Sequence, residues 1–297
     1  MPNDPSPAPT GAPVELVTPS LLRGWSLPAV KDSKYARGQV LVIGGAQKTP
    51  GAAMLAGLAV LRVGAGHLTL AVAESAAVSV AVAIPESGVV GLPQNASGSV
   101  RGGDLSELAD YASSCDVVVV GPGLDDPEET GAMLRNLTPL LGPETHVLLD
   151  AYALGTLPGV PELAEAVSGR VVLTPNKNEA GRLLGRDLED LQDDVVEIAR
   201  RYGAVVSCQS FVADPDGHRW LITSGQEGLA TSGSGDVLTG AIAGLLARGA
   251  TPAQAACWGT HLHAAAGDRL ASRVGLVGFL ARELLPELPL VLVELGA

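Results

Sequence analysis

The chain has 297 residues, of which 46% are hydrophobic and 17% charged, so it carries enough apolar material for a large buried core. Its formal net charge of −13 argues against non-specific binding to nucleic acid or to an anionic membrane, because both need basic patches. No signal peptide or membrane-spanning run is present and the 3 cysteines form no Cys-x-x-Cys pair, so we expect a soluble cytoplasmic protein without a zinc site.

The predicted elements alternate between strands and helices along the chain. Residues 1–13 are rich in Pro and Ala, which predicts a disordered tail ahead of a single folded unit over 14–297. Short continuous apolar runs predict strands buried on both faces at 39–44, 67–72, 116–123, 146–150, 171–175 and 204–207. Helical spacing of apolar residues predicts helices over 51–63, 105–113, 128–141, 178–184, 190–202 and 252–272. Residues 75–100 fit neither pattern.

Two further segments complete the predicted organisation. Asp214-Pro-Asp-Gly217 is a strong turn signal, and residues 218–223 fit the returning strand of a hairpin. The apolar run over 284–295 is open to two interpretations, an interface of a homo-oligomer or a core strand. The alternation of strands and helices predicts an α/β fold whose central, mostly parallel sheet is covered by helices on both faces.

Polar and glycine-rich residues gather directly after the ends of the predicted strands. They lie at 44–51, 121–123, Asp150, 174–179 and 233–236. Open α/β sheets bind their ligands at the carboxyl ends of the parallel strands, so we expect these five segments to converge on one edge.

The segment Gly228-Leu-Ala-Thr-Ser-Gly-Ser-Gly-Asp236 predicts a glycine-rich loop that opens a helix. Gly233 and Gly235 allow a tight turn and a close approach of the backbone to a ligand. The positive end of the helix would then face an anion. Asp236 falls in the first helical turn, where a carboxylate is either a helix cap or a base beside a bound phosphate.

Other titratable residues have open or structural interpretations. Asp150 either joins the site or bonds neighbouring N–H groups at its strand end. His261 and His263, spaced i and i+2 on a helix, point to different faces, so they make a poor metal pair, and we interpret His263 as structural packing. Lys177 is either a solvated charge or a phosphate contact.

The ordered motifs resemble the ADP-dependent NAD(P)H-hydrate dehydratases, which belong to the ribokinase-like superfamily. The resemblance covers roughly residues 25–285. Its motifs are Val40-Leu-Val-Ile-Gly-Gly45, Gly51-Ala52, Leu61-Arg-Val-Gly-Ala-Gly66, Val120-Gly-Pro-Gly-Leu124, Leu149-Asp-Ala-Tyr-Ala-Leu154 and the 228–236 loop.

The resemblance implies both a reaction and a set of site residues. The S-form of hydrated NADH or NADPH would be phosphorylated from ADP and would then lose phosphate, giving NADH or NADPH together with AMP and phosphate. Asp236 would be the general base and would also contact the hydrate, with Gly233, Ser234 and Gly235 binding nucleotide and phosphate. Ala52, Gly123 and, in place of a family histidine, Asn176 would line the hydrate site. Mg²⁺ is implied beside the phosphates, but the sequence identifies no metal ligands.

Two segments depart from the family pattern. Thr174-Pro-Asn-Lys-Asn-Glu179 has Asn176 where the family has a substrate-contacting histidine. The family's Lys-Gly segment is absent from residues 205–211, which removes a cation from the nucleotide side unless Lys177 replaces it. Two alternative functions therefore remain open, a ribokinase-like kinase of a small alcohol such as a vitamin precursor, or a weakly active nucleotide-binding regulatory protein.

Overall fold

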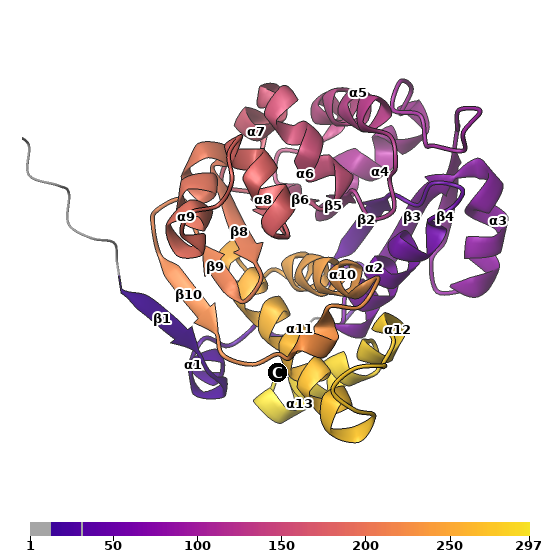
Figure 1. Cartoon of the computed structure of the whole chain (residues 1–297). Helices are drawn as coiled ribbons and strands as arrows, with labels where there is room; N and C mark the ends of the chain where they lie inside the picture. The colour runs from indigo at the N-terminus through magenta and orange to yellow at the C-terminus, as the bar shows by residue number, and fades with distance from the viewer. Residues whose placement is uncertain (1–12, 31) are drawn as a thin grey trace, which may run out of the picture.

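The computed structural model describes residues 13–30 and 32–297, so the predicted tail, apart from Pro13, lies outside the described residues. Ten strands form one sheet in the order β1-β10-β9-β8-β7-β6-β5-β2-β3-β4 (Figure 1). Strand β9 pairs antiparallel with both of its neighbours, and the other pairings are parallel. The strands are β1 (Val14–Val17), β2 (Gln39–Ile43), β3 (His67–Ala73), β4 (Gly88–Leu92), β5 (Val117–Val120), β6 (His146–Leu149), β7 (Val171–Leu173), β8 (Ala204–Cys208), β9 (Phe211–Ala213) and β10 (Arg219–Ile222).

Helices cover both faces of this sheet (Figure 1), which confirms the predicted α/β class. One face carries α1 (Pro19–Gly24), α2 (Pro50–Arg62), α3 (Glu74–Ala83), α10 (Ser234–Ala247), α11 (Pro252–Arg273), α12 (Ala281–Leu284) and α13 (Glu287–Leu295). The other carries α4 (Ala109–Ser114), α5 (Pro127–Leu137), α6 (Tyr152–Thr156), α7 (Pro161–Ala166), α8 (Lys177–Leu184) and α9 (Leu191–Tyr202). Among the described residues, no helix is long and apolar enough to cross a membrane.

The strands are continuously apolar because both of their faces are buried. In β2, Val40 and Val42 face the core under α2 and α10, while Leu41 and Ile43 face the core under α4 to α9. The four valines of β5 are fully buried in the middle of the sheet. Runs without polar alternation are the expected pattern for a parallel sheet between two helical layers.

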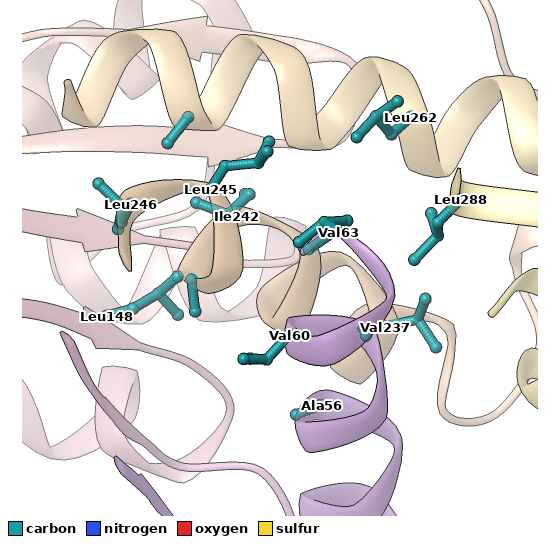
Figure 2. Packing of buried hydrophobic residues seen from close by; sticks show 14 of the residues in the cluster. Ala56, Val60, Val63, Leu148, Val237, Ile242, Leu245, Leu246, Leu262 and Leu288 are labelled. Carbon is teal, nitrogen blue, oxygen red and sulfur yellow. The ribbon is translucent and has the colours of Figure 1, made fainter. Parts of the chain in front are cut away.

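Helices α2 and α10 pack closely enough for their backbones to touch. A Cβ atom added to Gly240 of α10 would lie 2.0 Å from the carbonyl oxygen of Ala56 on α2. Figure 2 shows Ala56 and Val60 of α2 beside the apolar residues of α10. This contact holds the N-terminal ends of both helices at the same edge of the sheet.

The structure assigns the segments that the sequence left open. Residues 75–100 contain most of α3, which begins at Glu74, and the edge strand β4, and β1 pairs with β10. The core-strand interpretation of 284–295 is wrong, because this run ends in helix α13. Its buried residues Leu288, Val291, Leu292 and Leu295 recur at helical spacing. The hairpin over 211–222 is confirmed, with β9 and β10 antiparallel.

Candidate active site

The strand-end segments form one continuous set of contacts at the carboxyl edge of the sheet. The N–H of Gly45, after β2, donates to the carbonyl of Pro122, after β5, at 2.8 Å. The hydroxyl of Thr174, after β7, lies 3.1 Å from Asp150 Oδ1 and 3.2 Å from the hydroxyl of Thr239 on α10. The predicted convergence of these segments is therefore confirmed.

The ends of β5 and β6 touch through their backbones. Gly121 has φ +132°, and a Cβ there would lie 1.8 Å from the carbonyl oxygen of Asp150. Ala151, which follows Asp150 and precedes helix α6, also has a positive φ of 49°, in a region that residues with side chains rarely adopt. A side chain at position 121 is therefore excluded by both space and backbone conformation.

The glycine-rich loop turns into α10 as expected. Gly233 has φ +86° and precedes the first helical residue, Ser234. A Cβ added to Gly233 would lie 2.6 Å from Leu55 Cδ1 on α2, 3.3 Å from Ala281 Cβ on α12 and 3.7 Å from Asp236 Oδ2. The loop therefore packs against apolar side chains on the side where Asp236 lies.

Asp236 is a partly buried carboxylate in the first turn of α10, with no side-chain hydrogen bond to any described residue. Burial, and then the charge of Asp150, raises the pKa of Asp236 to about 7. The pKa of Asp150 is raised to about 6 by its own burial and by the charge of Glu179. An unpaired carboxylate that titrates near neutral pH can accept a proton from a substrate hydroxyl.

A cleft of about 510 Å³ lies on the other side of the loop, between α10, α11 and the ends of β7, β8 and β10. Ser234 and Gly235 line it, and a Cβ on Gly235 would meet open space there. Its volume is in the range of small-molecule sites. No Lys or Arg occurs among the described residues that line the cleft.

Ala52 and Gly123 lie next to each other at the start of α2. A Cβ on Gly123 would stand 3.1 Å from the Cβ of Ala52 and 2.3 Å from the carbonyl oxygen of Thr49. The hydroxyl of Thr49 also donates to the carbonyl of Gly123 at 2.7 Å. The structure thus brings together two residues that are far apart in the sequence, outside the lining of the cleft.

Asn176 begins helix α8 and lines the cleft. Its Oδ1 accepts the N–H groups of Asn178 and Glu179, and the Glu179 carboxylate accepts the N–H of Asn176 in a capping box. The oxygen of the Asn176 side chain is therefore committed to the helix, and its amide nitrogen makes no hydrogen bond to the described residues. Lys177 follows and is exposed. Burial raises the pKa of the Cys208 thiol, and the charge of Lys177 is close enough to oppose part of that rise.

The segment that lacks the Lys-Gly pair also reaches the cleft. Ser207 lines it with its hydroxyl 2.8 Å from that of Thr260 on α11. Gln209 lines it too, and has a left-handed backbone with φ +58°. Neutral hydrogen-bonding side chains thus occupy this wall of the cleft.

The interpretation of His263 as mere packing misses a contact with the loop. His263 Nε2 lies 2.8 Å from Ser234 Oγ, and both residues line the cleft. Nothing in the sequence indicates this pair, because the two residues lie 29 positions apart on different helices. His261 does not line the cleft, so the two histidines do point in different directions.

One group among the described residues has a metal-ligand arrangement. Asp214, Asp216 and His218 place their ligand atoms within 4.8 Å of one another at the turn between β9 and β10. The imidazole of His218 is 2.7 Å from the Asp214 carboxylate, which raises the pKa of His218. This turn is separate from the strand-end loops.

Comparisons with known proteins agree with this geometry. A family model described as NAD(P)H-hydrate dehydratase matches residues 40–290. The ADP-dependent (S)-NAD(P)H-hydrate dehydratase of Xanthomonas campestris is 43% identical over 291 residues, which cover 95% of this chain and 98% of that protein. The bifunctional NAD(P)H-hydrate repair enzyme of Moorella thermoacetica is 37% identical over 262 residues, and the chain spans 49% of its length.

Solved structures give the same assignment. The ADP/ATP-dependent NAD(P)H-hydrate dehydratase of Bacillus subtilis, co-crystallised with ATP and Mg²⁺, has a TM-score of 0.77 and 27% identity, covering 95% of this chain and 99% of that one. A ribokinase-like superfamily protein of Enterococcus faecalis has a TM-score of 0.78 at 22% identity, covering 95% and 96%, and shares the fold. The predicted enzyme class, a hydro-lyase, is confirmed together with the resemblance. The chain belongs to the NAD(P)H-hydrate dehydratase family.

Proposed function

We propose that this chain carries out the ADP-dependent dehydration of the S-form of hydrated NADH or NADPH. The observation that carries the proposal is the unpaired carboxylate of Asp236 beside the N-terminus of α10, with its pKa raised to about 7. Ser234 and Gly235 of the same loop line the cleft, whereas Ala52 and Gly123 do not. We treat residues 14–297 as one catalytic unit, because all ten strands belong to one sheet.

Asp236 acts as the general base in the first step. It takes the proton of the ring hydroxyl as that oxygen attacks the terminal phosphorus of ADP, and the bond from phosphorus to AMP breaks. The carbon–oxygen bond of the new phosphate ester then breaks, and phosphate leaves with the bonding electrons. Loss of a proton from the neighbouring ring carbon forms the double bond. The sum is hydrate and ADP giving the reduced dinucleotide, AMP and phosphate.

The loop residues hold the phosphoryl group. The N–H of Ser234 donates to the carbonyl of Thr231 at 3.2 Å, whereas the N–H groups of Gly235 and Asp236 have no partner within the helix. The Gly233–Gly235 turn would therefore bind the developing negative charge through the N–H of Gly235 and the hydroxyl of Ser234. ADP would occupy the cleft. The resemblance assigns Asn176 to the hydrate site, but Asn176 lines the cleft and Ala52 and Gly123 do not, so we assign its free amide nitrogen to the nucleotide instead. Ala52 and Gly123, packed against each other at the start of α2, would line the site of the hydrated nicotinamide.

A Mg²⁺ ion would offset the charge of the phosphates in this site. The Asp150 carboxylate is engaged by the hydroxyl of Thr174, and the Glu179 carboxylate accepts the N–H of Asn176. Among the described residues, the one group of three or more ligand-type side chains lies at the separate 214–218 turn, so we expect phosphate oxygens and water to supply most of the ion's ligands.

We infer the phosphoryl donor from the charge of the cleft, and the cellular compartment from the state of the cysteines. The absence of Lys and Arg from the described lining favours ADP over the more highly charged ATP. The three cysteines are free and buried, which suits the reducing cytoplasm.

The direct test supplies hydrated NADH, ADP and Mg²⁺ and follows the near-ultraviolet absorbance of reduced nicotinamide. We expect absorbance to return with AMP and phosphate released in equal amounts. Asp236→Asn should abolish turnover, whereas Asp193→Asn, a first-turn acid of the remote helix α9, should not.

Each alternative function has its own outcome in this assay. Phosphorylated product without reduced dinucleotide would identify a kinase of the ribokinase type. Calorimetric binding of ADP without turnover would identify a regulatory protein. Either result would end the proposal of a dehydratase.

A further inference from the structure

The hydroxyl of Ser234 and the imidazole of His263 meet inside the cleft. Ser234 Oγ lies 2.8 Å from His263 Nε2. Ser234 is 3% exposed and His263 8%, so water competes little for the contact. The pair joins the first residue of α10 to the middle of α11. The hydroxyl at the first residue of α10 is therefore held by a residue of a second helix.

The imidazole is neutral, because burial lowers the pKa of His263 to about 4. A neutral imidazole can donate from Nε2 or accept at Nε2, depending on which ring nitrogen carries the hydrogen. If Nε2 donates, the hydroxyl hydrogen of Ser234 stays free to point into the cleft. If Nε2 accepts, Ser234 Oγ presents only its lone pairs there.

The environment of Ser234 distinguishes these two arrangements. The hydroxyl stands at the N-terminus of α10, where a phosphate is attracted by N–H groups and the helix dipole. Lone pairs directed at the same place would repel that phosphate, whereas an O–H group would add a donor.

We propose that His263 is a positioning residue whose Nε2–H donates to Ser234 Oγ and thereby directs the Ser234 hydroxyl hydrogen onto the phosphoryl group leaving ADP. The inference rests on the proposed function. Because His263 fixes the hydroxyl before the reaction, little reorientation is needed when charge develops on the phosphoryl oxygens.

His261 provides a matched control on the same helix. It is 3% exposed, and burial lowers its pKa as well. Its Nδ1 has no hydrogen-bond partner among the described residues, and its side chain does not line the cleft. A purely structural role for buried histidines of α11 would make His261 and His263 equivalent in every assay.

The test measures kcat and the KM for ADP in variants of His263, Ser234 and His261. We expect His263→Leu to lower kcat about 10- to 100-fold, with the KM for ADP changed less than about threefold, since the donor acts on the transition state. Ser234→Ala should lower kcat by the same factor. The double variant should lower kcat by about the same factor as either single variant, because both changes remove the same interaction. His263→Gln, whose amide nitrogen can occupy the place of Nε2, should keep kcat within about fivefold. His261→Leu should keep kcat within about twofold.

Several outcomes would overturn the inference. They are an unchanged kcat in His263→Leu, losses that multiply in the double variant, a failure of His263→Gln to restore kcat, or an equal loss in His261→Leu. Nitrogen-15 NMR of the wild-type protein with ADP gives a readout that does not depend on variant folding. A protonated Nε2 on His263 supports the inference, and a bare Nε2 ends it. If the wild type shows no turnover, the proposed function fails, and the NMR result still decides the pair.

Discussion

Leu55 and Asp236 flank the same point beside Gly233. Leu55 Cδ1 lies 2.6 Å, and Asp236 Oδ2 3.7 Å, from the place where a Cβ on Gly233 would stand. Both side chains thus face the Cβ position of Gly233, and burial is the largest cause of the raised pKa of Asp236. We expect Leu55 of α2 to contribute to that burial.

Leu55→Ala should lower the pKa of Asp236 by admitting water. The base works as the carboxylate, so activity falls below its pKa, and the acid limb of kcat/KM should move from near pH 7 to lower pH. The measurement is the pH profile of kcat/KM, read by the position of the limb. Leu61→Ala, six residues further along α2, is the control, and an equal displacement in both variants would contradict the prediction.

Asp236→Asn should change the pH dependence of stability. The folded-state pKa of about 7 lies above the unfolded value, so between about pH 4 and 7 the folded wild type binds more protons than the unfolded chain. The wild type therefore loses stability as pH rises through this window, and the asparagine variant does not. Urea denaturation at pH 4.5 and pH 8, values chosen about either side of the window, should show an advantage of the variant that grows with pH. A constant difference would refute this.

Gly235→Ala should affect the stability of the fold and the binding of the nucleotide in different ways. The new Cβ meets open space in a helical turn, so the free energy of unfolding should stay the same or rise by about 0.5–1 kcal/mol. Because Gly235 lines the cleft, the added methyl group should crowd bound ADP and raise its KM about tenfold, the equivalent of roughly 1.4 kcal/mol. Gly155→Ala in α6, also facing open space, should leave the KM unchanged. A normal KM in Gly235→Ala would place ADP elsewhere.

Lys177→Ala decides between a solvated charge and a phosphate contact. Its charge acts on Cys208 at the end of β8, the strand that brings Ser207 and Gln209 to the cleft. If Lys177 replaces the missing cation, the variant should raise the KM for ADP about three- to tenfold and weaken its salt dependence. Arg182→Ala on the same helix is the control, and an unchanged KM in Lys177→Ala would leave Lys177 as a solvated charge.

Local sequence patterns were sufficient to predict the fold class and the edge of the sheet at which the site lies. Apolar runs such as 117–120 can be satisfied only between two helical layers, and the glycines and acids after the strands can gather only at the carboxyl edge. The glycine-rich loop, with Asp236 in the first helical turn, followed from the same local reasoning. Local spacing did not identify α13, because a short run of leucine and valine suits a strand as well as a helix.

Only the tertiary structure shows which neighbouring groups surround the side chains of the site. The approach of α2 to α10 through Gly240 places Leu55 beside Gly233, and the crossing of α10 and α11 brings His263 to Ser234. Neither contact has a periodic or local signature, since each joins residues on separate helices. The pKa of Asp236 and the orientation of the Ser234 hydroxyl depend on such neighbours, because burial and hydrogen bonding are properties of the folded surroundings rather than of residue type.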